Sequence, residues 1–314
     1  MKTYLIHRGL MMLLTLFGMS VLIFVLLRLA PGNITDILFD SAGYVDPRDK
    51  QLIEAELGLD QPYVVQYTQW IGGLLKGDLG KSFRLEVRAW TVIAPRVPIT
   101  VELALMAICI AVLLGVPTGV ISAVRQDTAL DYVLRVISLS GLSMPSFWLG
   151  LLIILGMISF MGISPIYVAA PQTWTDHLRL FGIPALAVGF RSSALIMRLT
   201  RSSMLEVLRQ DFIRTARAKG QNERVINYHH ALRNAILPVV TVIGIEFAFL
   251  IGGLVITETV FNIPGVARFL VQAILWRDYP IVQNLVMLIA VVVVCANFLV
   301  DLLYVVLDPR IQYS

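Results

Sequence analysis

The sequence is poor in charge, cysteine and histidine for a chain of 314 residues. Only 15% of the residues are charged and 57% are hydrophobic, which excludes an ordinary soluble globular domain and predicts a polytopic membrane protein. The two cysteines, Cys109 and Cys295, lie in apolar runs, which excludes a disulfide framework and indicates small buried apolar side chains. None of the four histidines has metal-ligand spacing to a cysteine or carboxylate, so we expect no bound metal.

The sequence also lacks the residues of an enzyme. No general acid/base pair or activated nucleophile is recognisable, so we expect no catalytic residue and no cofactor. Gly80-Lys81-Ser82 has the ending of a phosphate-binding G-x-x-x-x-G-K-S/T loop, but Leu75 occupies the position of its first glycine and no strand precedes it. Any ATP that drives this protein is therefore hydrolysed by another chain. The net charge of +4 follows from the excess of Lys and Arg that cytoplasmic loops of membrane proteins carry, so it does not indicate binding of nucleic acid.

Long apolar runs divide the chain into six predicted membrane spans. A helix needs ~20 apolar residues to cross a bilayer, and the runs lie at 9–27, 103–124, within 136–175, 180–197, 235–257 and 281–300. The first run is longer than the ~7–15-residue core of a signal peptide, so we expect an uncleaved span. The run at 136–175 holds one helix, which Pro145 would kink, and an apolar outer loop around 162–171.

The distribution of positive charge predicts the orientation of these spans. Six spans place both termini on one side, and the short segments of that side carry thirteen Lys and Arg against three on the other. We therefore expect both termini in the cytoplasm. The corresponding division is an N-terminal transmembrane helix at 1–30, an extracytoplasmic segment at 31–98 and a transmembrane domain at 99–314, with a large cytoplasmic loop at 202–234.

The segment at 31–98 is polar and contains two predicted short helices. Asp46 and Pro47 have the order of an N-cap and a first-turn proline, and Gly58 would end that helix. Pro62 opens the second helix. Its apolar stripe consists of Tyr63, Tyr67, Trp70 and Leu74. This segment could gate the outer mouth of a pathway or receive a substrate-binding protein; alternatively, it is a helical cap on the membrane helices.

A basic, polar stretch at 202–238 interrupts the apolar chain. Eight Lys and Arg and three acidic residues lie between Arg198 and Arg233. Ser203 and Glu206 have capping-box spacing and predict a helix start, and Gly220 is expected to end that helix. The helix would carry an apolar stripe of Leu205, Leu208, Phe212 and Ala216. The stretch could be only a solvated positive loop; alternatively, its small residues before Gly220 permit close approach of another protein.

Several phrases along the chain resemble the permease subunits of ATP-binding-cassette importers for dipeptides, oligopeptides and nickel. They include TARAKG and HALRNAILP in the basic stretch, GLSMPSFWLG around Pro145, ELGLDQPYVVQYTQW before the second span and DLLYVVLDPRI near the end. The resemblance is to the first permease (B-type) subunit of such systems. It implies an all-α polytopic protein of a bacterial inner membrane, with six transmembrane helices and the type I importer fold.

The resemblance also implies partners and a coupling site. Such a permease pairs with a second permease, two ATPase subunits and an external substrate-binding protein, and it contacts membrane lipid but no nucleic acid. The loop at 202–234 corresponds to the coupling loop that docks on the ATPase. Aligned on Gly220, the family's EAA triplet falls on 214–216, so its acidic first position is absent here. The implied coupling residues are Asp211, Arg214, Thr215, Ala216, Arg217, Ala218 and Gly220.

Two charges lie inside predicted spans. Arg191 precedes Arg198 by seven residues and Glu246 follows Pro238 by eight, so both lie roughly 10–12 Å from the coupling loop at ~1.5 Å per residue. A charge at mid-helix costs at least ~2.5 kcal/mol. We therefore hypothesise an Arg191–Glu246 ion pair that offsets this cost. The pair could be purely structural, or Arg191 could face the pathway and attract a substrate carboxylate.

Three functions are compatible with the sequence. The first is an importer permease for di- or oligopeptides, and the second is the same machine carrying nickel, glutathione or another small solute. The third is a stand-alone channel or proton-coupled carrier, which predicts inverted repeats or a ladder of membrane carboxylates. No repeat is apparent and only Glu246 lies well inside a span, which favours an importer. The paucity of histidine does not separate peptide from nickel, because a chelated metal needs no histidine ladder.

Overall fold

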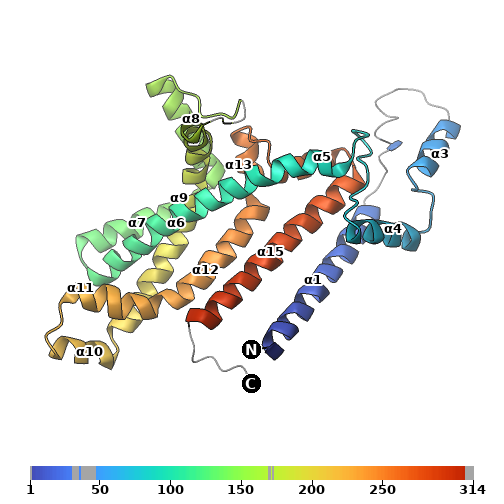
Figure 1. Cartoon of the computed structure of the whole chain (residues 1–314). Helices are drawn as coiled ribbons and strands as arrows, with labels where there is room; N and C mark the ends of the chain where they lie inside the picture. Colours follow the sequence, from blue (N-terminus) through green and yellow to red (C-terminus); the bar gives the residue numbers. More distant parts are fainter. Residues whose placement is uncertain (1, 30–34, 37–46, 169–170, 172, 308–314) are drawn as a thin grey trace. The chain divides into compact units, whose positions relative to one another are not determined.

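The computed structural model describes residues 2–29, 35–36, 47–168, 171 and 173–307, which form helices joined by short coils (Figure 1). Five helices are long and apolar enough to cross a membrane: Ile6–Leu29, Ala89–Val124, Trp174–Leu208, Glu223–Gly253 and Tyr279–Leu302. A sixth span is present if the bent pair Ala129–Ser143 and Ser146–Met161 counts as one. The predicted all-α polytopic fold is confirmed, and each predicted span overlaps one of these helices.

The helices group into two compact units. Unit 1 consists of Met1–Thr100 and Pro264–Val294, and unit 2 consists of Val101–Ile263 and Cys295–Ser314. Two long helices, α6 (Val97–Val124) and α15 (Tyr279–Leu307), contribute residues to both units. The described residues of the segment at 31–98 therefore belong to the same unit as the first span.

Unit 1 is held together by a buried apolar cluster. Its helices are α1 (Lys2–Leu29), α3 (Pro47–Glu56), α4 (Tyr63–Leu75), α5 (Ala89–Ile93), η1 (Ala94–Arg96), α14 (Val266–Leu275) and the first part of α15. The cluster joins α5, α14 and α15 through Ala89, Ile93, Val266, Phe269, Ala273, Ile281, Val282 and Leu285. Residues 264–294 thus pack on the beginning of the span Ala89–Val124.

Both short helices predicted between the first two spans form. The predicted helix cap at Asp46 lies outside the described residues, whereas α4 begins directly after Pro62 as predicted. Tyr67 and Trp70 of α4 pack on Phe24 of α1, with ring centroids 5.3 and 6.3 Å from the Phe24 centroid. The aromatic stripe therefore fixes α4 on the first span, although Tyr63 at its start is exposed.

Asp278, directly before α15, organises the loop that precedes α5. Its carboxylate is fully buried and accepts hydrogen bonds from the Ser82 hydroxyl and from the backbone N–H groups of Phe83 and Arg84, the last two at 3.2 Å. A buried carboxylate needs such donors because its desolvation is otherwise uncompensated. The Gly80-Lys81-Ser82 phrase is thus part of a structural clamp in which the serine hydroxyl is already engaged.

Unit 2 is built along α9 (Trp174–Leu208), against which α7, α8 and α12 pack. Its other helices are α6, α7 (Ala129–Ser143), α8 (Ser146–Met161), α10 (Asp211–Ala218), α11 (Glu223–Val225), the π-helical turn η2 (Ile226–Ala231), α12 (Leu232–Gly253) and α13 (Val255–Val260). α7 and α8 are bent by 102° relative to each other at Pro145. The predicted kink is therefore a complete break, because proline lacks the N–H that would continue the helix.

Glycines allow α6 and α9 to approach closely. A Cβ atom on Gly115 would lie 2.7 Å from the carbonyl oxygen of Ser193, and one on Gly119 would lie 2.7 Å from that of Met197. Real Cβ atoms are not found so near a carbonyl, so both positions require glycine. The four-residue spacing places the two glycines on one face of α6, as in other close contacts between membrane helices.

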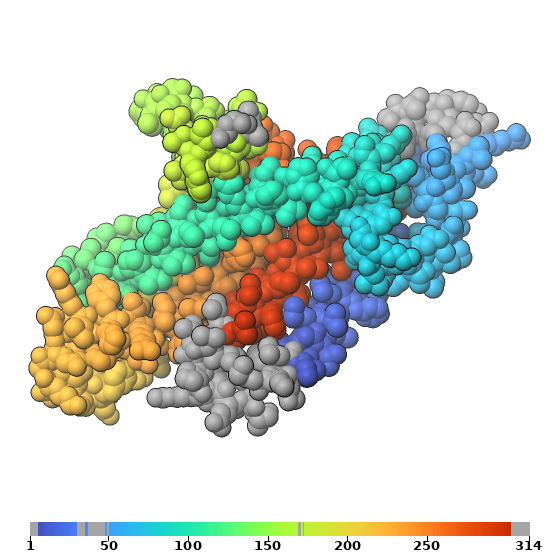
Figure 2. Space-filling model, viewed as in Figure 1, coloured from blue at the N-terminus to red at the C-terminus, as the bar shows by residue number. Residues whose placement is uncertain are grey.

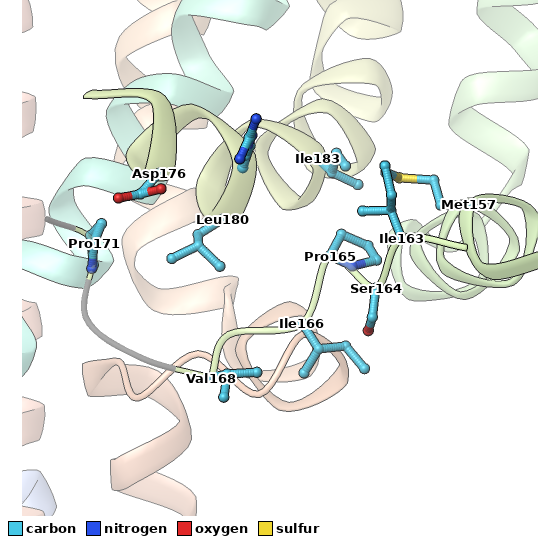
Figure 3. Close-up of a pocket in the computed structure, with 11 residues that line it drawn as sticks. Met157, Ile163, Ser164, Pro165, Ile166, Val168, Pro171, Asp176, Leu180 and Ile183 are labelled. Atoms are coloured by element: carbon cyan, nitrogen blue, oxygen red, sulfur yellow. The ribbon is translucent and has the colours of Figure 1, made fainter. Parts of the chain in front are cut away.

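An apolar pocket of about 680 Å³ lies in unit 2 where α9 begins (Figure 3). The end of α8, the coil that follows it and the first turns of α9 supply Met157, Ile163, Pro165, Ile166, Leu180 and Ile183. Asp176, at its edge, belongs to a capping box with Thr173, whose hydroxyl accepts from Asp176 N at 3.3 Å. Residues 163–166 and 168 of the apolar loop predicted around 162–171 thus form one wall of this pocket.

We expect Gly119→Ala to destabilise the protein by about 1–3 kcal/mol, because the added methyl group overpacks the contact with α9. Gly156→Ala in α8 is the matched control, since nothing lies within 4 Å of a Cβ atom there. Both variants would be purified in detergent and their melting temperatures compared with that of the unchanged protein. Equal melting temperatures for the two variants would contradict the close approach of α6 and α9.

Candidate coupling site

α10 is a short helix that follows α9 at one end of unit 2 (Figure 1). α9 ends at Leu208 and α10 begins at Asp211. The helix start predicted at Ser203 is wrong, because α9 continues through this residue and the serine side chain is buried within it. The predicted apolar stripe is consequently divided between the last turn of α9 and α10.

Gly220 closes the end of α10, as predicted. Its φ of +73° lies in the left-handed region, which side-chain-bearing residues rarely adopt. Its N–H donates to the carbonyl of Arg217 at 2.9 Å, and the N–H of Gln221 donates to the carbonyl of Ala216 at 3.3 Å. These bonds satisfy carbonyl groups that a helix end would otherwise leave free.

One face of α10 is buried in an apolar cluster that we call the Ile213 cluster. Ile213 itself is fully buried. Its neighbours come from α6, α9, η2 and α12: Val120, Ala123, Met204, Val207, Ile226, Ala231 and Ala235. Full burial of such a side chain contributes about 1.5–3 kcal/mol. The side chain of Ile213 therefore anchors α10 to the ends of the long helices of unit 2.

The opposite face of α10 is exposed (Figure 2). Among the predicted coupling residues, Ala216 is partly buried against the Ile213 cluster, and the exposed ones are Asp211, Arg214, Thr215, Arg217, Ala218 and Gly220. Phe212 is 41% exposed, although it is large and aromatic. Sequence reasoning missed Phe212 as a surface residue, because its spacing assigned it to the buried stripe.

Two ion pairs lie on the surface of this segment. Arg217 donates to both carboxylate oxygens of Glu223 at 2.8 and 3.3 Å, and Arg214 lies 3.3 Å from Asp211. All four side chains are exposed, so each pair contributes at most ~1 kcal/mol to stability. The Arg217–Glu223 pair bridges α10 and α11, whereas the Arg214–Asp211 pair lies within α10, and the burial of Ile213 remains the main attachment of α10.

A π-helical turn, η2, connects α11 to α12. It carries His229 and His230, whose ring centroids lie 5.2 Å apart. The buried Nε2 of His230 has no hydrogen-bond partner among the described residues. π-helical turns occur often at functional positions. Sequence periodicity did not reveal this turn, because a single wider turn shifts the apolar pattern by only one residue.

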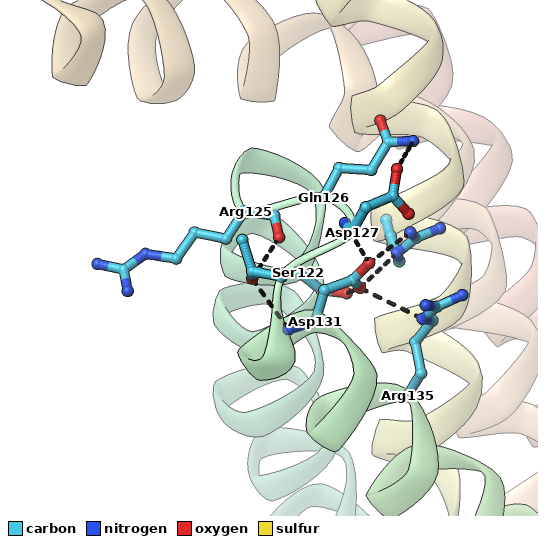
Figure 4. Close-up of polar contacts among 8 residues, drawn as sticks. Ser122, Arg125, Gln126, Asp127, Asp131 and Arg135 are labelled. Carbon is cyan, nitrogen blue, oxygen red and sulfur yellow. Dashed lines mark hydrogen bonds and ion pairs between the residues drawn. The ribbon is translucent and has the colours of Figure 1, made fainter.

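Asp131 is a fully buried carboxylate in the first turn of α7 (Figure 4). It accepts two hydrogen bonds from Arg201 of α9, at 3.0 and 2.9 Å. The Ser122 hydroxyl and the Asp127 N–H also donate to it, the latter at 3.1 Å, and Arg135 lies 3.5 Å away. These partners use the acceptor capacity of the carboxylate. The Asp131 network therefore joins α6, α7 and α9 around a buried negative charge that Arg201 neutralises.

The Asp131 network was not predicted, because Asp131 lies between the predicted spans at 103–124 and 136–175, where no helix was expected. One local signal was present: Thr128 has N-cap character, and its hydroxyl accepts from Asp131 N at 3.4 Å. This signal could have placed the start of α7. The contact with Arg201 is separated by 70 residues in the chain, and no periodic pattern reveals it.

Glu246 of α12 has a different partner from the predicted one. It accepts a hydrogen bond from the Ser192 hydroxyl at 2.7 Å, and no ion pair joins it to Arg191 in the described structure. Successive residues of an α-helix are about 100° apart around its axis. Arg191, the preceding residue of α9, therefore lies on a different face of the helix from Ser192. Both Arg191 and Glu246 are half-buried.

Comparison with protein families gives two matches that together span most of the chain. Residues 115–313 match the family described as binding-protein-dependent transport system inner membrane component, and residues 1–104 match the N-terminal region of the membrane component of such systems. The chain is 37% identical over 336 residues to the di/tripeptide transport system permease protein DppB of Pseudomonas aeruginosa (strain UCBPP-PA14). It is 38% identical over 339 residues to the dipeptide transport system permease protein DppB of Escherichia coli (strain K12). Both similarities cover 100% of each chain.

Two solved structures share the fold. One is an amino acid ABC transporter with histidines, with a TM-score of 0.53 and 17% identity, covering 68% of this chain and 93% of that chain. The other is the MetNI methionine ABC transporter in inward-facing conformations, with a TM-score of 0.58 and 18% identity, covering 69% of this chain and 96% of that chain. At these identities the similarity concerns the fold alone, and it agrees with the predicted importer permease fold.

We expect Asp131→Asn to lower the free energy of unfolding by about 3–5 kcal/mol, because Arg201 would keep its charge and lose a buried counter-ion. Glu223→Gln is the matched control. It removes the same kind of charge from an arginine pair, but Glu223 is 59% exposed, so the loss should be at most ~1 kcal/mol. Melting temperatures in detergent measure both effects. A similar loss of stability in the two variants would show that burial does not increase the contribution of Asp131 to the free energy of unfolding.

Proposed function

Because the chain belongs to the family of inner membrane components of binding-protein-dependent transport systems, we propose that it forms half of a peptide pathway driven by a separate ATPase docked on α10. It is a multi-pass transport subunit of the inner membrane and not an enzyme. The observation that carries the proposal is the two-sided character of α10. Ile213 is buried with the ends of α6 and α9, while the opposite face is exposed.

The proposed docking surface consists of exposed residues of α10 and its closing turn: Asp211, Phe212, Arg214, Thr215, Arg217, Ala218 and Gly220. Phe212 supplies an apolar anchor of the kind that dominates protein interfaces. Thr215 and Ala218 are small enough to let a partner approach the backbone. Because Arg214 stands where the family has an acidic residue and pairs with Asp211, we expect apolar contact to outweigh ion pairing in docking.

The proposed assembly contains this chain, a second permease, two ATPase subunits and an external substrate-binding protein. The excess of Lys and Arg on the segments that include α10 supports a cytoplasmic location for α10 and for both termini. This location is a requirement of the proposal, because an ATPase works where ATP is present. The segment at 31–98 would then lie outside, where it could meet the binding protein.

In the proposed mechanism, closure of the ATPase pair displaces the exposed face of α10. The Ile213 cluster transmits this displacement to the ends of α6 and α9 and to the start of α12, because close-packed interiors deform little. Gly220 and η2 are the places where the connection to α12 departs from regular α-helix. These positions would absorb the change in backbone angles while the spans change between outward- and inward-facing arrangements.

The proposed cargo is a di- or oligopeptide. Full-length similarity to two permeases named for dipeptide or di/tripeptide transport supports this choice over nickel or glutathione. Arg191 forms no ion pair in the described part of the chain, so we propose that it faces the pathway and attracts the carboxylate of the peptide.

The first test of the coupling proposal is a pull-down of the tagged chain expressed with its partner subunits. We expect Ala218→Trp combined with Phe212→Asp to remove the ATPase subunits while the second permease is retained, because the changes alter only the exposed face of α10. Arg125→Trp is the matched control, since it places the same bulky side chain on another exposed turn of unit 2.

Loss of the ATPase from the control as well would indicate a general defect. Retention of the ATPase by the α10 variant would contradict docking on this surface. A chain that purifies without any ATPase or second permease would favour the stand-alone carrier.

The cargo is tested by uptake of a radiolabelled dipeptide into vesicles that contain the assembled transporter. We expect uptake that requires ATP and is unaffected by excess nickel, and we expect Arg191→Gln to raise the KM several-fold with little change in kcat. Arg191→Lys keeps the positive charge and should restore much of the affinity. Uptake of nickel but not of peptide, or an unchanged KM in Arg191→Gln, would contradict these proposals.

A further inference from the structure

A cavity of about 690 Å³ lies beside the Asp131 network, between α7 and the last turns of α9. Its polar lining comes mainly from arginine: Arg135, Arg198, Arg201 and Arg209, with Glu206 and Ser202. All of these residues belong to unit 2. The cavity lies at the end of two membrane-spanning segments, because α9 ends at Leu208 and Asp131 is in the first turn of α7. We call it the arginine cavity.

The charges of the arginine cavity are not balanced by the protein. Arg201 is engaged by Asp131 through two hydrogen bonds. Arg198 and Arg209 are exposed and form no ion pair in the part of the chain that the structure describes. Glu206 supplies one negative charge to the lining, against the positive charges of Arg135, Arg198 and Arg209. The cavity therefore keeps a positive excess after its internal pair is counted.

Arg135 also has unused hydrogen-bond donors. Its Nε lies 3.5 Å from an oxygen of Asp131, which is an ion-pair distance and not a hydrogen bond. Buried Nε and Nη2 atoms of this guanidinium have no acceptor among the described residues. The carboxylate of Asp131 is already bonded by Arg201, Ser122 and Asp127, so it offers Arg135 little further capacity. A guanidinium in this state favours an external oxygen anion, and phosphate matches its planar geometry.

An exposed apolar surface adjoins the arginine cavity. Tyr132 and Leu139 lie three residues before and four residues after Arg135 on α7, so they share its helix face. They are 54% and 61% exposed, although they are large and hydrophobic. The guanidinium of Arg135 lies 4.4 Å from the centre of the Tyr132 ring. Tyrosine and arginine at the end of an apolar helix surface are typical of the boundary between hydrocarbon and headgroups.

We propose that the arginine cavity binds the phosphate of an anionic glycerophospholipid, with an acyl chain on the exposed face of α7 around Leu139. Arg135, Arg198 and Arg209 hold the phosphate, while Arg201 stays with Asp131 and fixes the wall of the site. The adjoining apolar surface selects a lipid over a soluble phosphate, because only a lipid covers both parts. Basic pockets between membrane helices at the headgroup level are suited to this class of ligand.

The bound lipid would have a mechanical consequence. The cavity is built on the last turns of α9, and the residues that follow lead directly into α10. A phosphate that bridges α7 and α9 would add to the Asp131 network, which joins the same two helices. The inference does not depend on the identity of the transported substrate or on ATPase docking, so it can fail or stand independently of the proposed function.

The test is native mass spectrometry of the delipidated transporter complex, titrated with phosphatidylglycerol and, separately, with zwitterionic phosphatidylcholine. We expect phosphatidylglycerol to bind at least about tenfold more tightly, because hydrogen bonds between charged groups are the stronger kind. Arg198→Gln combined with Arg209→Gln should weaken phosphatidylglycerol binding at least about tenfold. Both residues are exposed and outside the Asp131 network, so the fold should persist.

Arg125→Gln combined with Arg224→Gln is the matched control, since it removes the same charge from two other exposed positions of unit 2. This control should bind phosphatidylglycerol like the unchanged protein. Equal binding of the two lipids, or equal weakening in the control, would overturn the proposal. Displacement of the lipid by an equal concentration of inorganic phosphate would assign the cavity to a soluble anion instead. Binding to the isolated chain but not to the complex would also overturn the proposal, because a partner protein would then cover the cavity in the assembled transporter.

Discussion

Gly115 and Gly119 allow the backbones of α6 and α9 to meet, and the other contacts of unit 2 depend on this approach. At this separation the last turns of the two helices enclose Ile213, and Ser122 of α6 comes within hydrogen-bonding range of Asp131. A wider spacing would open the apolar cluster and leave the buried carboxylate short of a donor. Because unpaired polar groups are costly where water is absent, close helix packing is a condition for both the apolar and the ionic contacts.

This packing gives α10 two kinds of attachment of different stiffness. Ile213 is enclosed by side chains of α6, α9, η2 and the start of α12, and such contacts hold their geometry because interiors are close-packed. The connection onward to α12 is different in kind. It contains a glycine at positive φ, exposed ion pairs that stabilise little, and the π-helical turn η2. A force applied to α10 would therefore move the helix ends that pack on Ile213, while the segment that links α10 to α12 changes its backbone angles.

The spans and Gly220 were predictable because each is dictated locally. A helix that spans a bilayer requires a long apolar run, and a residue that ends a helix in the left-handed conformation is usually glycine. The helix start predicted at Ser203 was wrong because it too rested on a local pattern. The capping-box spacing of Ser203 is local, whereas its burial in α9 results from tertiary packing. Local sequence patterns did not identify the residue that contacts Glu246. The similar depth of Arg191 and Glu246 in the membrane suggested that they form an ion pair. The packing of α9 instead places the Ser192 hydroxyl within hydrogen-bonding distance of Glu246.

The positive charge that indicates orientation in the sequence separates into distinct environments in the structure. Any cytoplasmic lysine or arginine would serve the orientation rule equally. Yet Arg201 is used internally by Asp131, Arg217 is matched by Glu223, and Arg198 and Arg209 keep no ion-pair partner in the described residues. The arginines with internal partners contribute little net field, because each is cancelled nearby. Arg198 and Arg209 thus place part of the unpaired positive charge at the arginine cavity, which gives the orientation signal one specific location at the end of α9.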